Sequence, residues 1–421
     1  MDIMKTILKK QIELIKLDKE IMKKINRVSK DFCDELKKSI KNKKIKAEVF
    51  IGGSLAKNTL VKTDDNSYDV DIFVRFDKKY EEKEISKLLE KVIGNKAKKV
   101  HGSRDYYQIL IDNIILEIIP VIKISKPEQA RNVTDLSYFH VRYVLGKINK
   151  SKKLADEIII AKAFSHAQKC YGAESYIHGF SGYALELLII HYGSFLNFIK
   201  AISKSEKDKI IIDDGKFFKD KKKVLIEVNE SKLISPIILI DPTFKERNAL
   251  SGLSLETFDR FRKVCKDFLE NPSPDFFKKK SVYCEFKDYK NLKTICVKTD
   301  KQSGDISGTK SKKFFDFFIF QAEKEFVIKK SGFDYDENKN IAYYYLIVDK
   351  KPDETIRGPP IIRVEHLTAF KKAHGDAFVK DNYAWVKVSH DISFESWLKK
   401  FLEKDKRVLE SMSIKEVEIV K

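Results

Sequence analysis

The chain has 421 residues, which exceeds what one compact core normally organises, so about two to four domains are expected. Hydrophobic residues make up 43% of the sequence and charged residues 35%, which excludes an intrinsically disordered chain and is typical of a folded, highly charged protein. Lys and Arg total 83 against 63 Asp and Glu, and the net charge of +20 favours contact with a polyanion such as nucleic acid.

The sequence predicts neither a membrane-spanning segment nor a disulfide scaffold. The apolar runs are all far shorter than the ~20 residues of a membrane-spanning helix. The N-terminal segment MDIMKTILKK carries charge among its apolar residues and lacks the apolar stretch of a signal peptide. The five cysteines are dispersed and show no CxxC spacing, which argues against a disulfide framework and against a structural zinc site. We therefore expect a cytoplasmic protein with no membrane partner.

The N-terminal third of the sequence predicts an α/β unit. Apolar residues recur at helical spacing over residues 5–44, which indicates one or two amphipathic helices. From Ala47 onward the pattern changes to short strand-like runs, AEVFIGG, DVDIFVRF, YYQILI and IILEIIPVI, and a helix is predicted over 82–93 between the second and third runs. Such an order predicts a small mixed sheet with covering helices.

After about residue 150 the pattern is mainly helical. Long helices are predicted over 154–170 and 181–202, with the breaker GFSG between them. A third helix is predicted over 254–270, after a polar loop at 241–252, and NPSP follows it as the expected domain boundary.

The C-terminal third predicts a separate α+β domain. Runs of strand-like alternation at 281–286, 293–298, 341–350 and 382–389 are mixed with helices predicted around 312–329 and 394–402. Lysines and aromatic residues are dense here, and aromatic side chains can stack on single-stranded RNA ends while lysines meet phosphates; the alternative is that these aromatic residues alternate into a core. We expect an α+β multidomain chain, with domains at 1–148, 149–272 and 273–421.

A glycine-rich turn followed by paired acids is the main chemical signal. Gly52, Gly53 and Ser54 end a predicted strand and begin a predicted helix, SLAKNTL. Glycine lets the backbone pass close to a ligand, and a helix N-terminus offers free N–H groups to a phosphate. Asp69 and Asp71 follow within a strand, where residues i and i+2 share a face and have Cα atoms roughly 6–7 Å apart.

The paired carboxylates point to a divalent cation. Two carboxylates side by side repel each other unless a cation neutralises them, and Mg²⁺ prefers oxygen ligands. Glu117 is the one acid in the apolar run IILEIIPVI, and a buried charge needs a partner or a metal. Three carboxylates can hold two Mg²⁺ ions, one activating an attacking 3′-hydroxyl and one steadying a triphosphate and leaving pyrophosphate. Taken singly, either acid motif is equally compatible with a solvated strand edge.

This ordered set resembles the DNA polymerase beta-like nucleotidyltransferase superfamily, and within it the archaeal-type (class I) CCA-adding enzymes. The closer match is carried by YFHVRYV at 138–144, AKAF…YGAE at 161–174, GFSGYALELLIIHYGSF at 179–195, DPTFKERNALSGLS at 241–254 and RGPP at 357–360. The resemblance implies template-independent addition of C, C and A to the 3′ end of tRNA from CTP and ATP. It implies Mg²⁺ as the cofactor and release of pyrophosphate.

The resemblance also implies roles for individual residues. The metal-binding acids would be Asp69, Asp71 and Glu117, and the nucleotide-binding residues would be Gly53, Ser54, Lys57, His140, Lys162, Tyr171 and Arg247, with Arg247 facing the base. Three positions depart from the family pattern. The acids read Asp-Val-Asp and then Glu, where relatives more often have Glu first and Asp third, and Lys57 stands where arginine is usual.

Some alternatives stay open at this point. Lys162 is also compatible with a solvated helical lysine, His140 and Tyr171 with capping or core residues, and Arg247 with a surface arginine in a polar loop. An oligoadenylate synthetase-like or poly(A) polymerase-like transferase on the same scaffold is the alternative activity. A non-catalytic RNA-binding protein is disfavoured because all three acids are present. The resemblance implies contact with the acceptor stem and T arm of tRNA and is compatible with a homodimer.

Overall fold

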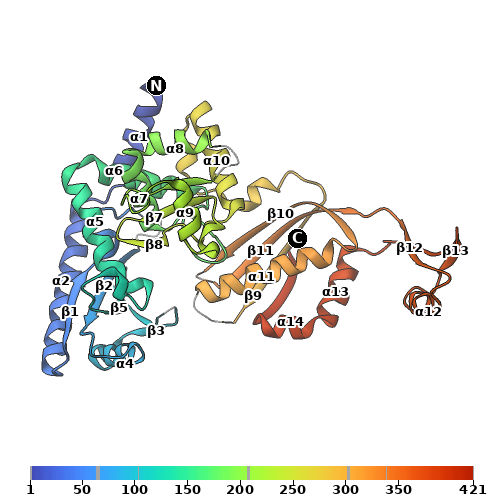
Figure 1. The fold of residues 1–421 in the computed structure, drawn as a ribbon, viewed down its shortest axis with the longest axis horizontal. Helices are drawn as coiled ribbons and strands as arrows, with labels where there is room; N and C mark the ends of the chain where they lie inside the picture. The colour runs from blue at the N-terminus through green and yellow to red at the C-terminus, as the bar shows by residue number, and fades with distance from the viewer. Residues whose placement is uncertain are drawn as a thin grey trace. The chain divides into compact units, whose positions relative to one another are not determined.

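The computed structural model describes residues 2–62, 67–102, 104–205, 209–300, 304–337 and 339–420 (Figure 1). The chain forms two compact units, Met1–Lys279 and Lys280–Lys421. The first unit contains two large hydrophobic cores and the second contains an aromatic-rich core of its own. The predicted boundary near residue 148 falls inside the first unit and stays a prediction, as does the boundary at 272.

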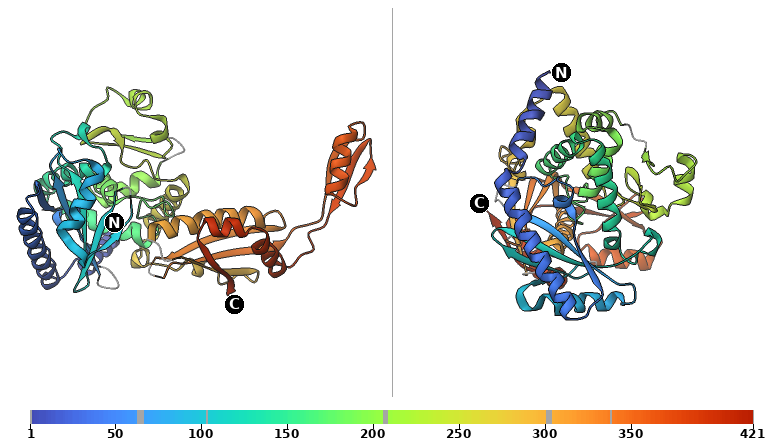
Figure 2. Two further views of the ribbon diagram at one scale, coloured as in Figure 1. Left: turned by 90° about the horizontal axis from the view of Figure 1, so that it is seen from below. Right: turned by 90° about the vertical axis from the view of Figure 1, so that its left-hand side faces the viewer.

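The N-terminal segment, expected to form one or two amphipathic helices, forms two, α1 (Asp2–Ile15) and α2 (Lys19–Asn42). The stripe Ile25, Cys33, Leu36 and Ile40 of α2 is buried in the core that includes the sheet. Apolar residues of α1 pack instead against the second, helical core, and α1 contacts α6 (Lys153–Ala167). The two helices therefore connect both cores of the first unit, as the ribbon views show (Figures 1 and 2).

A five-stranded mixed sheet forms the first core, as the sequence predicted. The strand order is β1-β2-β5-β4-β3, and β2 and β5 are its parallel pair. Helix α4 (Glu82–Ile93), which has the predicted bounds, packs against β5. The strands are β1 (Ala47–Ile51), β2 (Tyr68–Phe76), β3 (Lys98–Val100), β4 (Tyr106–Ile111) and β5 (Ile114–Ile122).

The second core of the first unit is helical and rich in phenylalanine. Its helices are α5 (Ser137–Lys150), α6, α7 (Gly182–Tyr192), α8 (Phe195–Ser203) and α10 (Leu255–Glu270). The single helix predicted over 181–202 is wrong, because α7 and α8 are two helices bent by 92°. Gly193 ends α7 in a left-handed conformation (φ 76°), and the Ser194 hydroxyl accepts the Asn197 N–H to cap α8.

A small three-stranded sheet next to the helical core was not predicted. Its order is β6 (Ile210–Ile212), β7 (Ile237–Asp241) and β8 (Phe244–Asn248), and α9 (Lys221–Glu227) lies between β6 and β7 in the sequence. The predicted loop over 241–252 is therefore wrong at β8. A tight turn joins β7 to β8, since the Asp241 carboxylate accepts both the N–H and the hydroxyl of Thr243.

The second unit is built on an antiparallel sheet with the order β10-β11-β9-β15. Helix α11 (Gly304–Ala322) lies across this sheet (Figure 1). Phe314, Phe318, Tyr344 and Trp397 meet in the core, so most aromatic residues of this region pack inward and are not an exposed stacking surface. The other elements are β9 (Leu292–Thr299), β10 (Phe326–Asp336), β11 (Ile341–Lys350), α13 (Phe394–Lys404), α14 (Lys406–Ser411) and β15 (Ile414–Val420).

Two sequence predictions in this unit are wrong. The helix expected over 312–329 ends at Ala322, and Phe326 begins β10, whose alternating side chains are explained by its pairing with β11. The run at 281–286, expected as a strand, forms a short 3₁₀ helix over Val282–Glu285, which the Ser281 side chain caps.

A second, smaller sheet of the same unit stands apart from its core (Figures 1 and 2). It pairs β12 (Glu354–Pro360), β14 (Tyr383–Val388) and β13 (Phe378–Lys380), with α12 (Val364–Ala373) alongside. Helix α12 buries none of its residues fully, and Ile362 is 84% exposed. The buried residues of this sheet are on β14, where Ala384 and Val386 are 0% and 5% exposed.

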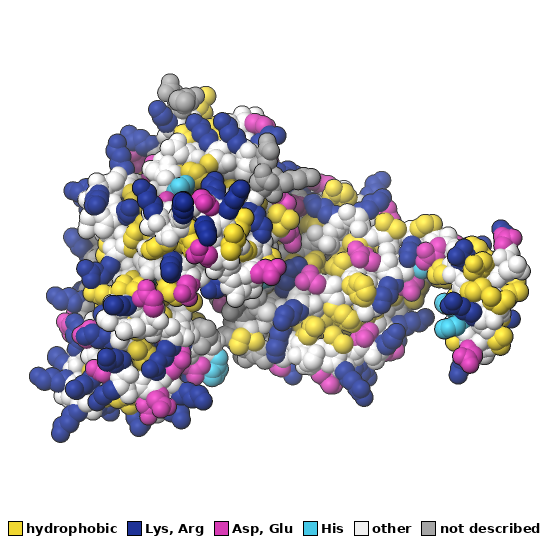
Figure 3. Space-filling model, viewed as in Figure 1, with side chains coloured by type: hydrophobic (Ala, Val, Ile, Leu, Met, Phe, Trp, Pro, Cys, Tyr) yellow, Lys and Arg dark blue, Asp and Glu magenta, His cyan; other side chains and the backbone are white. Residues whose placement is uncertain are grey.

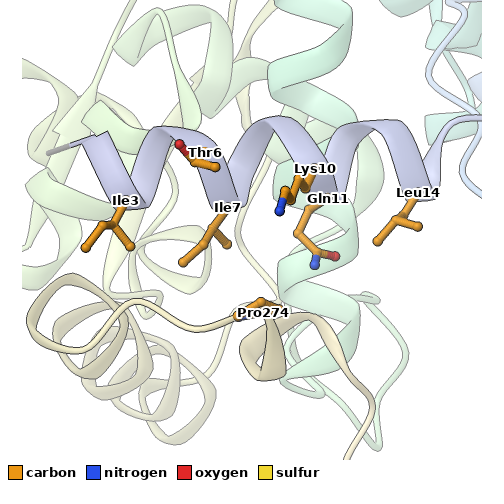
Figure 4. A pocket seen from close by; sticks show the side chains of 7 residues that line it. All are labelled: Ile3, Thr6, Ile7, Lys10, Gln11, Leu14 and Pro274. Carbon is orange, nitrogen blue, oxygen red and sulfur yellow. The ribbon is translucent and has the colours of Figure 1, made fainter.

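Among the described residues, no single helix is long and apolar enough to cross a membrane. Lysine and arginine side chains are spread over the surface with acidic residues between them (Figure 3). A shallow apolar hollow runs along α1 beside Pro274 (Figure 4), and it contains none of the predicted site residues.

Candidate active site

The predicted acids lie on one face of the parallel pair β2 and β5. Asp71 is directly opposite Glu117 in the register, and Asp69 lies two residues before Asp71 on the same face. The alternate residues, including Val70 and Leu116, are buried on the other face. Strand pairing thus brings Glu117 beside Asp69 and Asp71, although it follows Asp71 by 46 positions along the chain, and the sequence predicted this acid on an adjacent strand.

The glycine turn lies against Asp71. Gly53 has a left-handed φ of 54°, and a β-carbon built there would stand 1.7 Å from Oδ2 of Asp71. The Gly52 N–H donates to the Asp71 carbonyl at 2.8 Å. Helix α3 (Gly53–Ala56) is shorter than predicted, because Asn58 has a left-handed φ of 53° that ends the turn. The turn therefore carries Ser54 and Lys57 to the side of the acids.

A buried charge cluster joins this turn to the helical core. The Lys162 ammonium donates to Glu186 Oε1 at 2.9 Å, to Ser54 Oγ at 3.1 Å and to Thr59 Oγ1 at 3.0 Å. Lys57 donates to Glu186 Oε2 at 2.6 Å. Lys162 is 4% exposed, which contradicts the alternative of a solvated lysine, whereas His166 on the same helix is exposed.

Sequence reasoning did not single out Glu186. The signal that could have identified it is the one that identified Glu117, a lone acid within an apolar run, here ALELLII at 184–190. Burial alone would raise the pKa of Glu186, but the Lys162 and Lys57 ammonium groups outweigh burial and the pKa is lowered. The carboxylate is therefore ionised between two cations.

Burial also shifts the pKa values of the other titratable groups of the site. It raises the pKa of Asp71, against the opposing effect of Lys57 and Lys162, so an additional cation beside this carboxylate would be favoured. Burial also lowers the pKa of Lys57, against the opposing effect of Glu186. The Tyr171 pKa is raised by burial and by neighbouring carboxylates, so its phenol stays protonated and can donate a hydrogen bond.

Tyr171 enters the same region from beyond α6. Its hydroxyl occupies space beside Gly182, where a β-carbon would stand 2.8 Å from the hydroxyl oxygen and 3.9 Å from Cε of Lys162. A bridge between Tyr171 and Phe180 fixes the backbone there. Gly182 thus leaves room for the phenol beside the lysine.

The remaining two predicted residues converge on Asp241. Arg247 donates to Asp241 Oδ2 at 2.8 Å, and Nε2 of His140 lies 3.0 Å from the same oxygen. Tyr183 donates to Oδ1 at 3.0 Å, and its ring stacks on His140 with centroids 3.9 Å apart. Arg247 lies in β8, not in the loop that the sequence predicted. Asp241 and Tyr183 were missed, although both lie in the motifs quoted above.

These contacts fix the orientation of the Arg247 guanidinium and leave part of its side chain exposed. The Arg247 side chain is 20% exposed, and its guanidinium lies 5.6 Å from the Tyr183 ring centroid. Burial lowers the pKa of His140, despite the opposing effect of Asp241, and therefore favours the neutral imidazole. The Asp241 pKa is lowered although burial opposes this, because His140 and Arg247 both stabilise the carboxylate.

The donor set fits Mg²⁺ in chemistry. Carboxylate oxygens are its preferred protein ligands, and burial of the partly exposed Asp71 side chain raises the pKa of that carboxyl, so a cation beside it would stabilise its charged form. Within the described ranges, no three His, Cys, Asp or Glu side chains are grouped closely enough to hold a metal by themselves. Glu117 accepts a hydrogen bond from Gln108 Nε2 at 2.8 Å. Mg²⁺ commonly takes one or two carboxylates and completes its shell with water and substrate phosphates.

Comparison with known proteins identifies the family of the chain. Residues 33–135 match the family described as "Nucleotidyltransferase domain", and residues 156–278 match "tRNA nucleotidyltransferase, second domain". A CCA-adding enzyme of Nanoarchaeum equitans is 33% identical over 339 residues, which cover 80% of this chain and 82% of that protein. The chain belongs to the family of CCA-adding enzymes.

Other relatives extend the match. A CCA-adding enzyme of Methanocaldococcus jannaschii is 32% identical over 401 residues, 89% of this chain and 85% of that protein. Crystal structures of the Cid1 poly(U) polymerase include one with Mg and 3′-dATP bound, which has a TM-score of 0.50 to this chain at 14% identity. That likeness covers 65% of this chain and 98% of the polymerase, and it bears on the fold alone. The family and the nucleotidyltransferase fold predicted from the sequence are both confirmed.

Proposed function

We propose that the face of β2 and β5 is the site at which this CCA-adding enzyme joins nucleotides to the 3′ end of tRNA. Asp69, Asp71 and Glu117 would hold Mg²⁺, which when bound lowers the barrier to attack by the 3′-hydroxyl and stabilises the departing pyrophosphate. Gly53 keeps the space above Asp71 free of a side chain, so a phosphate can approach that carboxylate closely.

The triphosphate would lie between the glycine turn and the helical core. Lys57 and Lys162 offer two ammonium groups there, and Ser54 and Tyr171 offer hydroxyl donors. These four side chains come from three segments that the fold brings together. Because they are largely shielded from water, each is worth more to a bound phosphate than it would be on the surface.

The base of CTP or ATP would meet Arg247. Asp241 and the Tyr183 ring hold its guanidinium in one orientation, and a planar guanidinium can donate two parallel hydrogen bonds to a base edge. His140, neutral and stacked on Tyr183, completes the wall of this region. Selection between the two nucleotides would therefore come from protein side chains together with the tRNA end, without a template.

The tRNA partner would be held largely through lysines, given the net charge of +20. The family implies tRNA, CTP and ATP as substrates. We propose further that the lysine-rich second unit contacts the acceptor stem and T arm, since duplex RNA is recognised mainly through phosphates and 2′-hydroxyls.

The register that places Asp71 opposite Glu117, with the Lys57–Glu186–Lys162 cluster beside it, carries the proposal. The test is to supply purified protein and Mg²⁺ with tRNAs ending before, within and after the CCA sequence. CTP and ATP are added singly and together, and the product ends are sequenced. Addition of C, C and A followed by a stop is expected. Long A tracts, or no use of CTP, would instead support the poly(A) polymerase-like alternative.

A further inference from the structure

Glu186 is a fully buried carboxylate that is not among the metal-binding or nucleotide-binding residues proposed above. It lies in the middle of α7 and is 0% exposed. Its two oxygens are divided between two lysines from different parts of the chain, Oε2 bonded to Lys57 at 2.6 Å and Oε1 bonded to Lys162 at 2.9 Å. The carboxylate therefore bridges the glycine turn and helix α6.

The hydrogen-bond geometry explains how the bridge orients both cations. An ammonium group has three N–H donors. Lys162 directs them to Glu186, Ser54 and Thr59, so its rotation is fixed from three sides. Within the part of the chain that the structure describes, Lys57 directs one donor to Glu186 and keeps two for other acceptors. A triphosphate oxygen can meet Lys57 directly and can replace the Ser54 hydroxyl at Lys162.

The two lysine charges also require the Glu186 carboxylate between them. Two buried ammonium groups sharing one acceptor repel each other, and burial alone disfavours both charged forms. Glu186 reduces the formal charge of the three groups from +2 to +1 in a region with little water. An amide at residue 186 has nearly the same shape but removes that compensation.

We propose that Glu186 is a positioning residue for nucleotidyl transfer, holding the ammonium groups of Lys57 and Lys162 side by side to receive the triphosphate of CTP or ATP. This inference rests on the proposed function, in which those lysines bind the triphosphate. Glu186 itself touches the lysines and not the reacting atoms. Its substitution should weaken triphosphate binding equally in the ground state and the transition state, which raises KM and leaves kcat nearly unchanged.

The test compares Glu186→Gln with the wild-type enzyme in tRNA extension. We expect KM to rise about 10- to 100-fold for both CTP and ATP, because the triphosphate is common to both, with KM for tRNA unchanged. Glu186→Asp keeps the charge on a shorter arm and should restore part of the lost affinity. An unchanged or lower KM for both nucleotides would overturn the proposal, because the carboxylate would then be dispensable or would compete with phosphate.

A matched control separates positioning from general destabilisation. Glu157→Gln makes the same chemical change in α6, where Glu157 accepts the Phe195 N–H at 2.7 Å outside the lysine cluster. This variant should keep the wild-type KM. If Glu186→Gln lowers the melting temperature of the free protein, CTP binding is measured by how much saturating CTP raises that temperature. This rise should be smaller for the variant than for the wild type.

A double variant tests whether Glu186 acts through the lysines. If it does, adding Lys57→Gln to Glu186→Gln should raise KM by much less than the product of the single effects. Fully multiplicative effects would mean that Glu186 acts by another route. A wild-type enzyme that fails to add C, C and A would reject the proposed function, whereas a normal wild type with a normal Glu186→Gln variant would reject this inference alone.

Discussion

The carboxylate of Asp71 occupies the space that a side chain at Gly53 would need, with Oδ2 only 1.7 Å from the position of a β-carbon. Residue 53 also has a φ of 54°, which L-residues adopt at a cost. We expect Gly53→Ala to displace Asp71 and to reduce transfer by on the order of 100-fold, since small displacements of reacting groups have large effects on rate. Single-turnover extension of tRNA measures this loss.

Gly94 provides the control for backbone strain. It has a left-handed φ of 71°, but a β-carbon there would meet no atom within 4 Å. Gly94→Ala should therefore lose about 1–3 kcal/mol of stability, like the backbone part of Gly53→Ala, while keeping its transfer rate. Equal rates in the two variants would show that the contact with Asp71 has no catalytic consequence.

Asp71→Ala should abolish transfer. The substitution removes a carboxylate from the proposed metal site, and we expect the rate to fall by at least about 1000-fold. Affinity for tRNA, measured by filter binding or fluorescence anisotropy, should stay within a few-fold of wild type because the lysine surface is unchanged. A variant with a near-normal rate would reject the assignment of Asp71 to the metal.

Asp241→Asn should disturb nucleotide choice. Arg247 would lose its charged partner and, with it, its fixed orientation beside Tyr183. We expect the discrimination between CTP and ATP to fall by about 10-fold when kcat/KM is compared at each addition step. Glu246→Gln is the control, because Glu246 is an exposed acid next to Arg247 on strand β8. Unaltered discrimination in Asp241→Asn would argue against base recognition by Arg247.

The lowered pKa of His140 predicts that the protein loses stability on mild acidification. Burial, with Arg247 and Lys57, lowers its pKa below 6.5 against the opposing effect of Asp241, so below that pH the unfolded chain binds the proton more readily than the folded chain. The free energy of unfolding should then decrease as pH falls below about 6.5, by at most about 1.4 kcal/mol per pH unit from this group. His140→Gln should show a shallower decline in melting temperature over that range. Parallel profiles for the two proteins would contradict the expected titration.

The sequence was most informative where a local pattern alone determines which face of a strand a side chain occupies. Alternation in a strand put Asp69 and Asp71 on one face without knowledge of the rest of the fold, and a lone acid in an apolar strand identified Glu117. These patterns placed the third acid on an adjacent strand, but the register that sets Asp71 opposite Glu117 comes from the fold. Buried partners such as Glu186 and Asp241 depend on which helices and strands meet, and periodicity does not report that.

The errors have two physical origins. Over 181–202 the apolar periodicity continues through the helix break, so the left-handed Gly193 was not distinguished from a helical glycine. Strands β8 and β10 are polar or highly charged, with lysines facing outward, and only their pairing with β7 and β11 makes them strands. At these two strands tertiary contacts overrode the local preference, whereas the break at Gly193 comes from local capping.

The pairing of β15 with β9 has a consequence for biosynthesis. Val417 of β15 lies opposite Val297 of β9, so a strand near residue 417 completes a sheet whose first strand is made more than a hundred residues earlier. All pairings of the five-stranded sheet, by contrast, lie within residues 47–122. On the ribosome, the carboxylate face can therefore assemble well before the second unit can close its sheet, and a stalled chain would present a nucleotidyltransferase core with an unpaired β9 edge.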